Sequence, residues 1–202
     1  MTMGSDTPDR LDRQISFLLE ADRLKQIERM TKILGESRRE NSAEHSWHLA
    51  LFALVLAEHA DEAFDVPRVI LMLLLHDLVE IDAGDTFAYD DAAYESKAER
   101  ERIAADRLFG ILPDDQGHDL RALWEEFEQG ETPEARFANA VDRLQPLLLN
   151  HANNGGPWRE HGISRERVVA RNAPIGAGST SLWSFARLRI DEVQARGILA
   201  DS

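Results

Sequence analysis

The chain lacks cysteine and any long apolar run. None of its 202 residues is a cysteine, which excludes disulfide bonds, thiolate zinc sites and thiol nucleophiles together. The longest aliphatic run, Val69 to Leu75, is too short for a helix that crosses a bilayer. The N-terminal residues 1–8 are polar and acidic, so no signal peptide is expected. These absences predict a soluble, cytoplasmic protein with no membrane partner.

Positive charge is also scarce. The 23 lysines and arginines are outnumbered by 37 acidic residues, which gives a net charge of −14. No run of lysine or arginine is long enough to form a basic patch. The backbone of a nucleic acid would be repelled by such a chain. We therefore expect no nucleic-acid polymer as a partner.

A period of two residues, typical of strands, is hardly visible, whereas a 3.6-residue apolar period runs through nearly the whole chain. This pattern predicts an all-α fold in one domain, residues 1–202, with a core at about 11–151 and a C-terminal loop and helix at about 152–197. Helices are expected at about 8–27, 41–60, 65–84, 92–109 and 117–129, with a further helix from Pro133 onward. Residues 35–41 are expected to be irregular, and Pro146 is expected to kink its helix.

The central helix carries ionisable groups inside an otherwise apolar sequence. At about 100° per residue, Glu80 falls between His76 and Asp77, about 40° from the first and 60° from the second. Gly84 then breaks the helix and delivers Asp85 from a loop. Buried charges are costly unless they are paired or bind a metal. The cluster indicates a metal, although the His-Asp dipeptide alone also fits a structural hydrogen-bonded pair.

Further ligand types lie on other helices. His45 shares an inward stripe with Leu49, and Asp142 borders the apolar stripe of the helix that begins at Pro133. Each has an ordinary alternative, because His45 could be a satisfied core residue and Asp142 could pair with Arg143. Two imidazoles and two carboxylates together suit one divalent ion such as Mn²⁺, Co²⁺, Fe²⁺, Zn²⁺ or Mg²⁺. A tetrad that leaves positions for water is typical of a catalytic site.

The order His … His-Asp … Asp resembles that of the HD-domain metal-dependent phosphohydrolases. Longer strings carry a more specific likeness, namely Glu44–His48, His76–Asp85 and Ala140–Leu144. These strings resemble the 5′-deoxynucleotidase branch, the bacterial deoxynucleoside monophosphatases and their eukaryotic HD-domain-containing-2 relatives. The similarity extends from about Leu11 to His151, which is most of the chain.

The resemblance implies a fold, an activity and a metal site. The fold would be an HD-type helical bundle that forms a homodimer. The activity would be metal-dependent hydrolysis of a small phosphate ester, with removal of the 5′-phosphate of deoxynucleoside monophosphates as the expected reaction. One divalent metal ion would be held by the residues that match the family's ligands, His45, His76, Asp77 and Asp142.

The resemblance also implies catalytic roles. An arginine upstream of the first histidine would orient the phosphate; Arg29 is in the comparable place, in competition with Arg38 and Arg39. Glu80 would activate the attacking water, and Asp85 would reach the sugar or leaving-group side. The residues expected to contact the substrate are Arg29, His45, Asp77, Asp85, Thr86, Phe87 and Asp142.

The sequence departs from the bacterial enzymes after Asp85, where Thr86 to Tyr89 replaces their Leu-Pro-Thr. The identity of the nucleotide is therefore open. Phe87 and Tyr89 could stack on a base or pack against the core. His151 and Asn153, beyond Asp142, could line the pocket or simply cap a helix end.

Two other functions remain open at this stage. One is an HD phosphodiesterase or a nucleoside triphosphate hydrolase acting on a related nucleotide. The other is a non-catalytic helical module that binds a metal or a ligand without turnover, which metal analysis would test. A serine hydrolase is not indicated, because the chain has no Gly-x-Ser-x-Gly motif.

Overall fold

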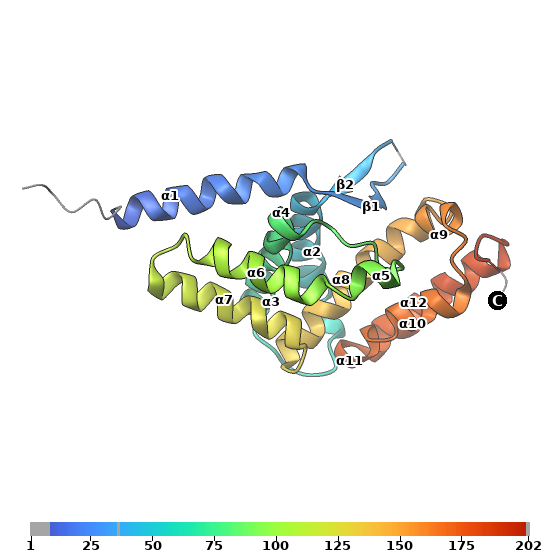
Figure 1. Ribbon diagram of the computed structural model, residues 1–202. Coiled ribbons are helices and arrows are strands. Elements are labelled where there is room, and N and C mark those ends of the chain that lie inside the picture. The colour runs from blue at the N-terminus through green and yellow to red at the C-terminus, as the bar shows by residue number, and fades with distance from the viewer. Residues whose placement is uncertain (1–8, 36, 201–202) are drawn as a thin grey trace, which may run out of the picture.

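The computed structural model of the protein describes residues 9–35 and 37–200. The N-terminal residues 1–8, on which the expectation of no signal peptide rests, lie outside this part. The described chain is a single helical domain with one small sheet, which confirms the predicted all-α class (Figure 1). No described helix combines the length and the apolar composition needed to cross a membrane.

The elements of the N-terminal half are α1 (Arg10–Ala21), the 3₁₀ helix η1 (Asp22–Gln26), β1 (Glu28–Lys32), β2 (Arg39–Asn41), α2 (Ser42–Leu56), η2 (Ala57–His59), α3 (Val66–Leu75), η3 (His76–Val79), α4 (Glu80–Ala83) and α5 (Asp91–Tyr94). Those of the C-terminal half are α6 (Lys97–Phe109), α7 (Asp114–Gln129), α8 (Pro133–Ala152), α9 (Pro157–Glu160), α10 (Arg165–Asn172), α11 (Ile175–Gly178) and α12 (Thr180–Ala195).

Several helix ends lie where the sequence predicts them. The Asn41 side chain accepts a hydrogen bond from the Glu44 backbone, and the Glu44 carboxylate accepts one from the Asn41 backbone, so α2 begins with a capping box. Gly84 and Gly130 have positive φ angles of 74° and 66° directly after α4 and α7. Glycine adopts this conformation without the steric penalty of a side chain, which explains why both helices end there.

The prediction of an irregular segment at 35–41 is wrong for its last residues. Arg39–Asn41 forms β2, which pairs antiparallel with β1 and places Glu28 opposite Asn41. A strand of three residues is too short to show an alternating pattern, and both strands are rich in charged residues. The hairpin carries Arg29 toward the middle of the domain, so this small sheet matters for the site.

The central helix also differs from expectation. The predicted helix from Asp65 to Gly84 is divided into α3, the 3₁₀ helix η3 and α4. A 3₁₀ helix has three residues per turn rather than 3.6, so side chains three positions apart eclipse each other. Asp77 and Glu80 therefore lie closer around the axis than the predicted α-helix places them, whereas His76 is turned further from Glu80. All three are nevertheless buried.

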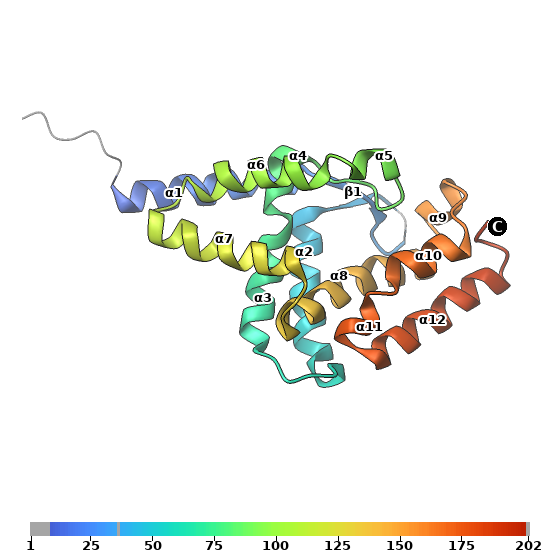
Figure 2. The same cartoon turned by 60° about the horizontal axis from the view of Figure 1, so that its bottom comes forward.

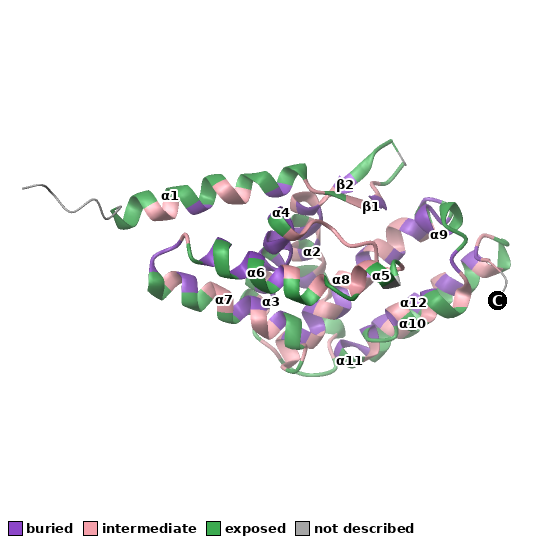
Figure 3. Ribbon diagram, viewed as in Figure 1, coloured by how far each residue is buried: buried purple, intermediate pink, exposed green. Residues whose placement is uncertain are grey.

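Helix α8 lies at the centre of the domain and packs against α2, α3, α7, α11 and α12. It continues as one helix through Pro146. The close approach of α11 depends on Gly178, where a Cβ atom would lie 2.5 Å from the carbonyl oxygen of Arg136. Figure 3 shows buried residues in the middle of the molecule, around α2 and α4, whereas α1 is largely exposed.

The C-terminal part contains more helices than predicted. Instead of a loop and one helix after residue 152, the chain forms α9, α10, α11 and α12. Figure 2 shows α10, α11 and α12 grouped at the end of the molecule opposite α1. The division of the domain near residue 151 remains a prediction.

Candidate active site

Three of the four predicted metal ligands converge from separate elements. His45 comes from α2, His76 from η3 and Asp142 from α8, and one ligand atom of each lies within 4.8 Å of the others. The Nε2 atom of His45 is 3.1 Å from Oδ1 of Asp142, and the Nε2 atom of His76 is 3.7 Å from the same oxygen. Because both histidines are buried, this cluster lies inside the domain.

Both imidazoles are held by their second nitrogen. Nδ1 of His45 is 3.2 Å from Oε1 of Gln145, and Nδ1 of His76 is 2.9 Å from the carbonyl oxygen of Leu73. Since α3 ends at Leu75, the Leu73 carbonyl is among those that an α-helix leaves without a helical partner. If each Nδ1 donates, each Nε2 presents its lone pair to the cluster, as metal-binding histidines do.

The donor set fits a divalent ion. The Nε2 atom of His76 is buried and has no hydrogen-bond partner in the described part of the chain, which is costly for a polar atom. Burial alone would lower the pKa of His76, but the charges of Asp77 and Asp142 raise it to about 9. The site therefore favours a positive charge at this nitrogen.

The surroundings of Asp142 favour the ionised form of its carboxyl group. Burial would raise the pKa of its carboxyl group, yet the neighbouring imidazoles of His45 and His76 hold that pKa well below its ordinary value. Imidazole nitrogen with carboxylate oxygen is a ligand set that suits Zn²⁺, Mn²⁺, Fe²⁺ or Co²⁺.

The fourth predicted ligand, Asp77, lies beside the cluster and is shared with an arginine. Its Oδ1 atom is 3.0 Å from Nε2 of His76, and its Oδ2 atom accepts a hydrogen bond from Nη1 of Arg29 at 2.7 Å. Asp77 is not one of the three residues whose ligand atoms group within 4.8 Å. Its part as a metal ligand remains a prediction.

Arg29 is the candidate arginine that the structure places in the site. Its guanidinium also lies 3.8 Å from Asp85 and 3.9 Å from Glu40. Burial would lower its pKa, but Asp77 and the other nearby carboxylates raise it above the ordinary value. Arg38 instead forms a surface ion pair with Glu44, and Arg39 is exposed.

Glu80 and Asp85 line the same space. Glu80 is buried, and its Oε2 atom accepts a hydrogen bond from the hydroxyl of Ser42 at 2.7 Å. Burial, together with the charge of Asp77, raises the pKa of Glu80 to about 8. Burial likewise raises the pKa of Asp85. Both carboxyl groups therefore hold a proton more readily than an exposed carboxyl group does.

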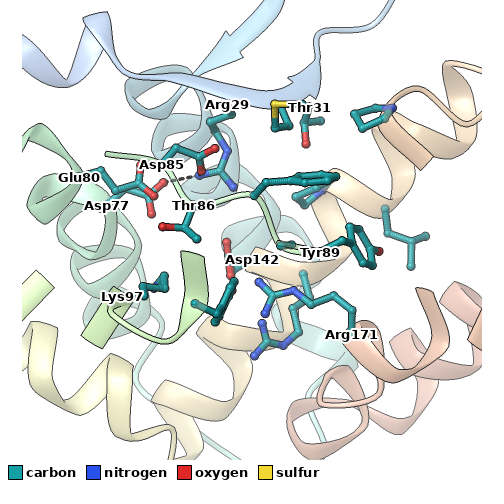
Figure 4. Close-up of a pocket in the computed structure, with 18 of the residues that line it drawn as sticks. Arg29, Thr31, Asp77, Glu80, Asp85, Thr86, Tyr89, Lys97, Asp142 and Arg171 are labelled. Carbon is teal, nitrogen blue, oxygen red and sulfur yellow. Dashed lines mark hydrogen bonds and ion pairs between the residues drawn. The ribbon is translucent and has the colours of Figure 1, made fainter. Parts of the chain in front are cut away.

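These side chains face a cavity of about 140 Å³ (Figure 4). In Figure 4, Arg29 and Asp85 lie above Asp142, and Thr86 and Tyr89 come from the loop that crosses the cavity. The rings of Phe87 and Tyr89 contact each other edge to face, with centroids 5.5 Å apart. The Tyr89 hydroxyl accepts a hydrogen bond from the indole of Trp158 at 3.1 Å. Both aromatic residues therefore line the cavity and also pack against their neighbours.

The sequence did not single out the residues that hold these groups. Gln145 and Glu40 lie behind His45, and the amide of Gln145 donates to Glu40 at 2.7 Å. The hydroxyl of Ser42 donates a hydrogen bond to Glu80, as described above. One sequence signal could have identified Gln145, because it directly follows Leu144 of the apolar stripe of α8 although it is polar. In the structure its side chain has no exposed surface. Arg143 and Arg171, which also line the cavity, were missed as site residues.

His151 and Asn153 have structural contacts away from the cavity lining. His151 lies 2.8 Å from Glu192 of α12. Asn153 accepts a hydrogen bond from the backbone of Gly35 and donates to the carbonyl oxygens of Lys32 and Ile33. The alternative of a structural role is thus the one that the contacts favour for both.

The comparisons with known proteins agree with this geometry. A family model described as "HD domain" matches residues 21–183. The chain belongs to the HD domain family. This membership confirms the resemblance drawn from the His … His-Asp … Asp order, and it covers the elements from the end of α1 to α12.

The HD-domain chain has named relatives. The "5′-deoxynucleotidase HDDC2" of Bos taurus is 30% identical over 135 residues, which cover 66% of this chain and 64% of that protein. The "5′-deoxynucleotidase" of Yersinia pestis is 30% identical over 133 residues, 61% of this chain and 66% of that one. The chain thus matches a little under two thirds of the length of the bovine protein.

Two solved structures share the fold. One is a crystal structure described as a "Predicted metal-dependent phosphohydrolase" from Magnetospirillum magnetotacticum MS-1; it is 53% identical, has a TM-score of 0.92, and the match covers 98% of this chain and 100% of that one. A conserved hypothetical protein from Pyrococcus furiosus is 24% identical with a TM-score of 0.58, over 89% and 99% of the two chains. The second likeness supports the fold alone.

Proposed function

We propose that this HD-domain protein is a divalent-metal-dependent phosphomonoester hydrolase that removes the 5′-phosphate of deoxynucleoside monophosphates. The observation that carries the proposal is the convergence of His45, His76 and Asp142 beside a cavity that the partly buried Arg29 also lines. The names of the bovine and bacterial relatives support the reaction, and the 53% identical crystal structure supports the class of enzyme.

In this proposal His45, His76, Asp142 and Asp77 hold one divalent ion. Such an ion lowers the pKa of a bound water and stabilises negative charge on a phosphoryl group. The identity of the ion stays open among Mn²⁺, Co²⁺, Fe²⁺, Zn²⁺ and Mg²⁺, because nitrogen and carboxylate ligands accept each of them.

Arg29 binds the phosphate. A chain with a net charge of −14 repels a phosphate at long range, so the site needs local positive charge. A guanidinium can hold two phosphate oxygens at once, and the ion pair with Asp77 fixes the position of this one. Asp77 and Asp142 line the same cavity as Arg29, and His45 lies beside Asp142. These three residues would contact the bound phosphate.

Glu80 orients or deprotonates the attacking water. Its hydrogen bond from Ser42 fixes one carboxylate oxygen, and a pKa near the working pH suits a general base. Asp85, on the loop after Gly84, accepts hydrogen bonds from the sugar or leaving-group side. Thr86 and Phe87 border the remainder of the substrate.

We also propose that two copies of the chain form a dimer, as the family resemblance implies. Apolar side chains are exposed around a hollow of about 640 Å³ between α2 and α12, including Leu51, Val55 and Phe185. Large exposed apolar patches mark interaction surfaces. A monomeric mass by light scattering at micromolar concentration would overturn the dimer. The cytoplasmic location stays a prediction.

A substrate panel tests the activity. Product formation is measured by chromatography for the deoxynucleoside and ribonucleoside 5′-monophosphates, a nucleoside triphosphate and a phosphodiester, each with Mn²⁺, Co²⁺ or Mg²⁺. The expected result is the highest kcat/KM for a deoxynucleoside monophosphate. Hydrolysis of only the triphosphate or only the diester would favour the alternative hydrolases, and binding of metal without any turnover would favour the non-catalytic module.

A further inference from the structure

A second pair of cations lines the cavity at a distance from the roles described above. Arg143 follows Asp142 on α8, and Arg171 comes from α10. In Figure 4 Arg171 extends from α10 into the cavity, on the opposite side of Asp142 from Arg29. Burial lowers the pKa of Arg143, and the positive charge of the nearby Arg171 lowers it further. Two guanidinium groups therefore share one wall.

Neither arginine forms an ion pair with a carboxylate in the described part of the chain. Some exposed arginines, such as Arg39 and Arg187, also lack an ion pair among the described residues, but Arg143 and Arg171 are partly buried. By contrast, Arg68, Arg107 and Arg121 each contact at least one carboxylate. Lys97, which lines the same cavity, is neutralised by Glu101 at 2.7 Å.

The donors of this pair are incompletely satisfied. The Nε atom of Arg143 is buried and has no hydrogen-bond partner among the described residues. A buried cationic donor without a partner costs free energy, and two like charges that face each other add to that cost. An anion bound between the two guanidinium groups would offset both effects, because arginine binds phosphate or carboxylate oxygens in pairs.

The surroundings of the pair leave room for an anion. The ring of Tyr94 lies 5.7 Å from the guanidinium carbon of Arg171 and helps to hold it in place. Glu128 also lines the cavity, and burial raises the pKa of its carboxyl group. In the described part of the chain, Glu128 forms no ion pair with either arginine, so both guanidinium groups border the cavity without a paired carboxylate.

We propose that Arg143 and Arg171 form a second anion subsite that binds a further phosphate on the leaving group of the substrate. The preferred substrate would then be a nucleoside bisphosphate, in which the 5′-phosphate reaches the metal cluster and Arg29 while the second phosphate reaches this pair. This inference rests on the proposed function, and it names the substrate class more narrowly.

The test compares two substrates of the same nucleoside, the 5′-monophosphate and the 3′,5′-bisphosphate. The variants are Arg171→Gln, Arg171→Lys and the surface control Arg187→Gln, which lies exposed on α12. Arg171 is only half-buried, so its replacement should leave the fold intact, and circular dichroism checks this. Hydrogen bonds to charged groups typically change binding roughly tenfold to hundredfold.

The expected result is a lower KM for the bisphosphate than for the monophosphate in the wild type. Arg171→Gln should raise the KM for the bisphosphate about tenfold or more while the KM for the monophosphate stays within about twofold. Arg171→Lys should restore part of the difference, and Arg187→Gln should change neither value. Equal KM values in the wild type, or an equal rise for both substrates in Arg171→Gln, would overturn the proposal.

Calorimetric titration in the presence of a chelator separates this inference from the proposed activity. Even if no substrate is hydrolysed, tighter binding of the bisphosphate that is lost in Arg171→Gln supports the subsite. Titration of inorganic phosphate alone is the second arm. If inorganic phosphate binds through Arg171 and the bisphosphate shows no advantage over the monophosphate, the pair holds a free phosphate ion and the proposed substrate class is wrong.

Discussion

Arg29 and Asp77 form a partly buried ion pair at 2.7 Å, and the other oxygen of Asp77 lies 3.0 Å from Nε2 of His76. One carboxylate therefore joins the arginine proposed to bind the phosphate to the histidine proposed to bind the metal. Complete removal of the Arg29 side chain would leave one oxygen of the buried Asp77 without its cationic partner, which is destabilising. A variant that keeps the charge is thus more informative than alanine.

The Arg29→Lys variant should bind the phosphate more weakly and still bind the metal. Lysine keeps a positive charge near Asp77 but lacks the planar pair of donors that matches two phosphate oxygens. The expected result is a KM about tenfold to hundredfold higher with metal content unchanged. Arg38→Lys, at the surface pair with Glu44, is the control. An unaltered KM in Arg29→Lys would show that another group binds the phosphate.

The Asp142→Asn variant should lose the metal and keep the fold. The introduced amide would offer a neutral oxygen where both histidines now face a carboxylate, and a neutral ligand binds a divalent ion more weakly. We expect loss of metal by elemental analysis, loss of activity and an unchanged circular dichroism spectrum. Asp114→Asn, at an exposed side chain, is the matched control. Metal binding as tight as in the wild type would remove Asp142 from the ligand set.

The Gln145→Leu variant should weaken metal binding although Gln145 is not a ligand. Its side-chain oxygen lies 3.2 Å from Nδ1 of His45 and orients the ring. Partners of this kind typically contribute about 10- to 100-fold to metal affinity, and a loss of about that size is expected in competition with a chelator. The variant also leaves Glu40 without the amide of Gln145, so thermal unfolding is measured in parallel. Unchanged affinity would mean that the backbone alone positions His45.

Much of this architecture could be predicted from the sequence because its signals are local. The capping box of Asn41 and Glu44, the glycines at 84 and 130, and the apolar stripe of α8 each depend on residues within a few positions. The ionisable cluster around the His-Asp dipeptide indicated a metal for a similar reason, since the burial of its side chains was evident from the apolar residues around them.

The features of the fold and the site that the sequence did not predict depend mostly on contacts between distant segments. The pairing of β1 with β2 arises from a chain reversal between strands too short for a visible period. The change from α3 to a 3₁₀ helix at His76 has no proline or glycine to indicate it. Arg143 and Arg171 are on different helices, and only the packing of the C-terminal helices brings them to one cavity.

The Glu80→Gln variant should keep the metal and lose most of the turnover. Glutamine has nearly the same shape and can still accept the hydrogen bond from Ser42, but it cannot take a proton from water. General bases typically contribute about 10²–10⁴-fold in rate, and kcat should fall by about that factor with metal content unchanged. Undiminished turnover in this variant would exclude Glu80 as the base.

The same variant should change how the stability of the metal-free protein depends on pH. Burial, with the charge of Asp77, raises the pKa of Glu80 from its ordinary value of 4.5 to about 8 in the folded chain. Between these values the unfolded chain releases the proton while the folded chain keeps it. The contribution of Glu80 to stability is therefore fully present below a pH of 4.5 and is lost as the pH rises through about 8.

Glutamine at position 80 resembles the protonated carboxyl group at every pH. With a chelator present, the Tm of Glu80→Gln relative to the wild type should thus increase from about pH 5 to about pH 8.5. The pKa of Asp85 is also raised, but Asp85 is present in both proteins. Its contribution to the pH dependence of Tm therefore largely cancels in the comparison. Glu44→Gln is a control of opposite sign, because Arg38 lowers the pKa of Glu44 and its removal should reduce Tm at both pH values. A Tm difference for Glu80→Gln that is the same at both ends of this pH range would show that Glu80 is already ionised in the folded chain.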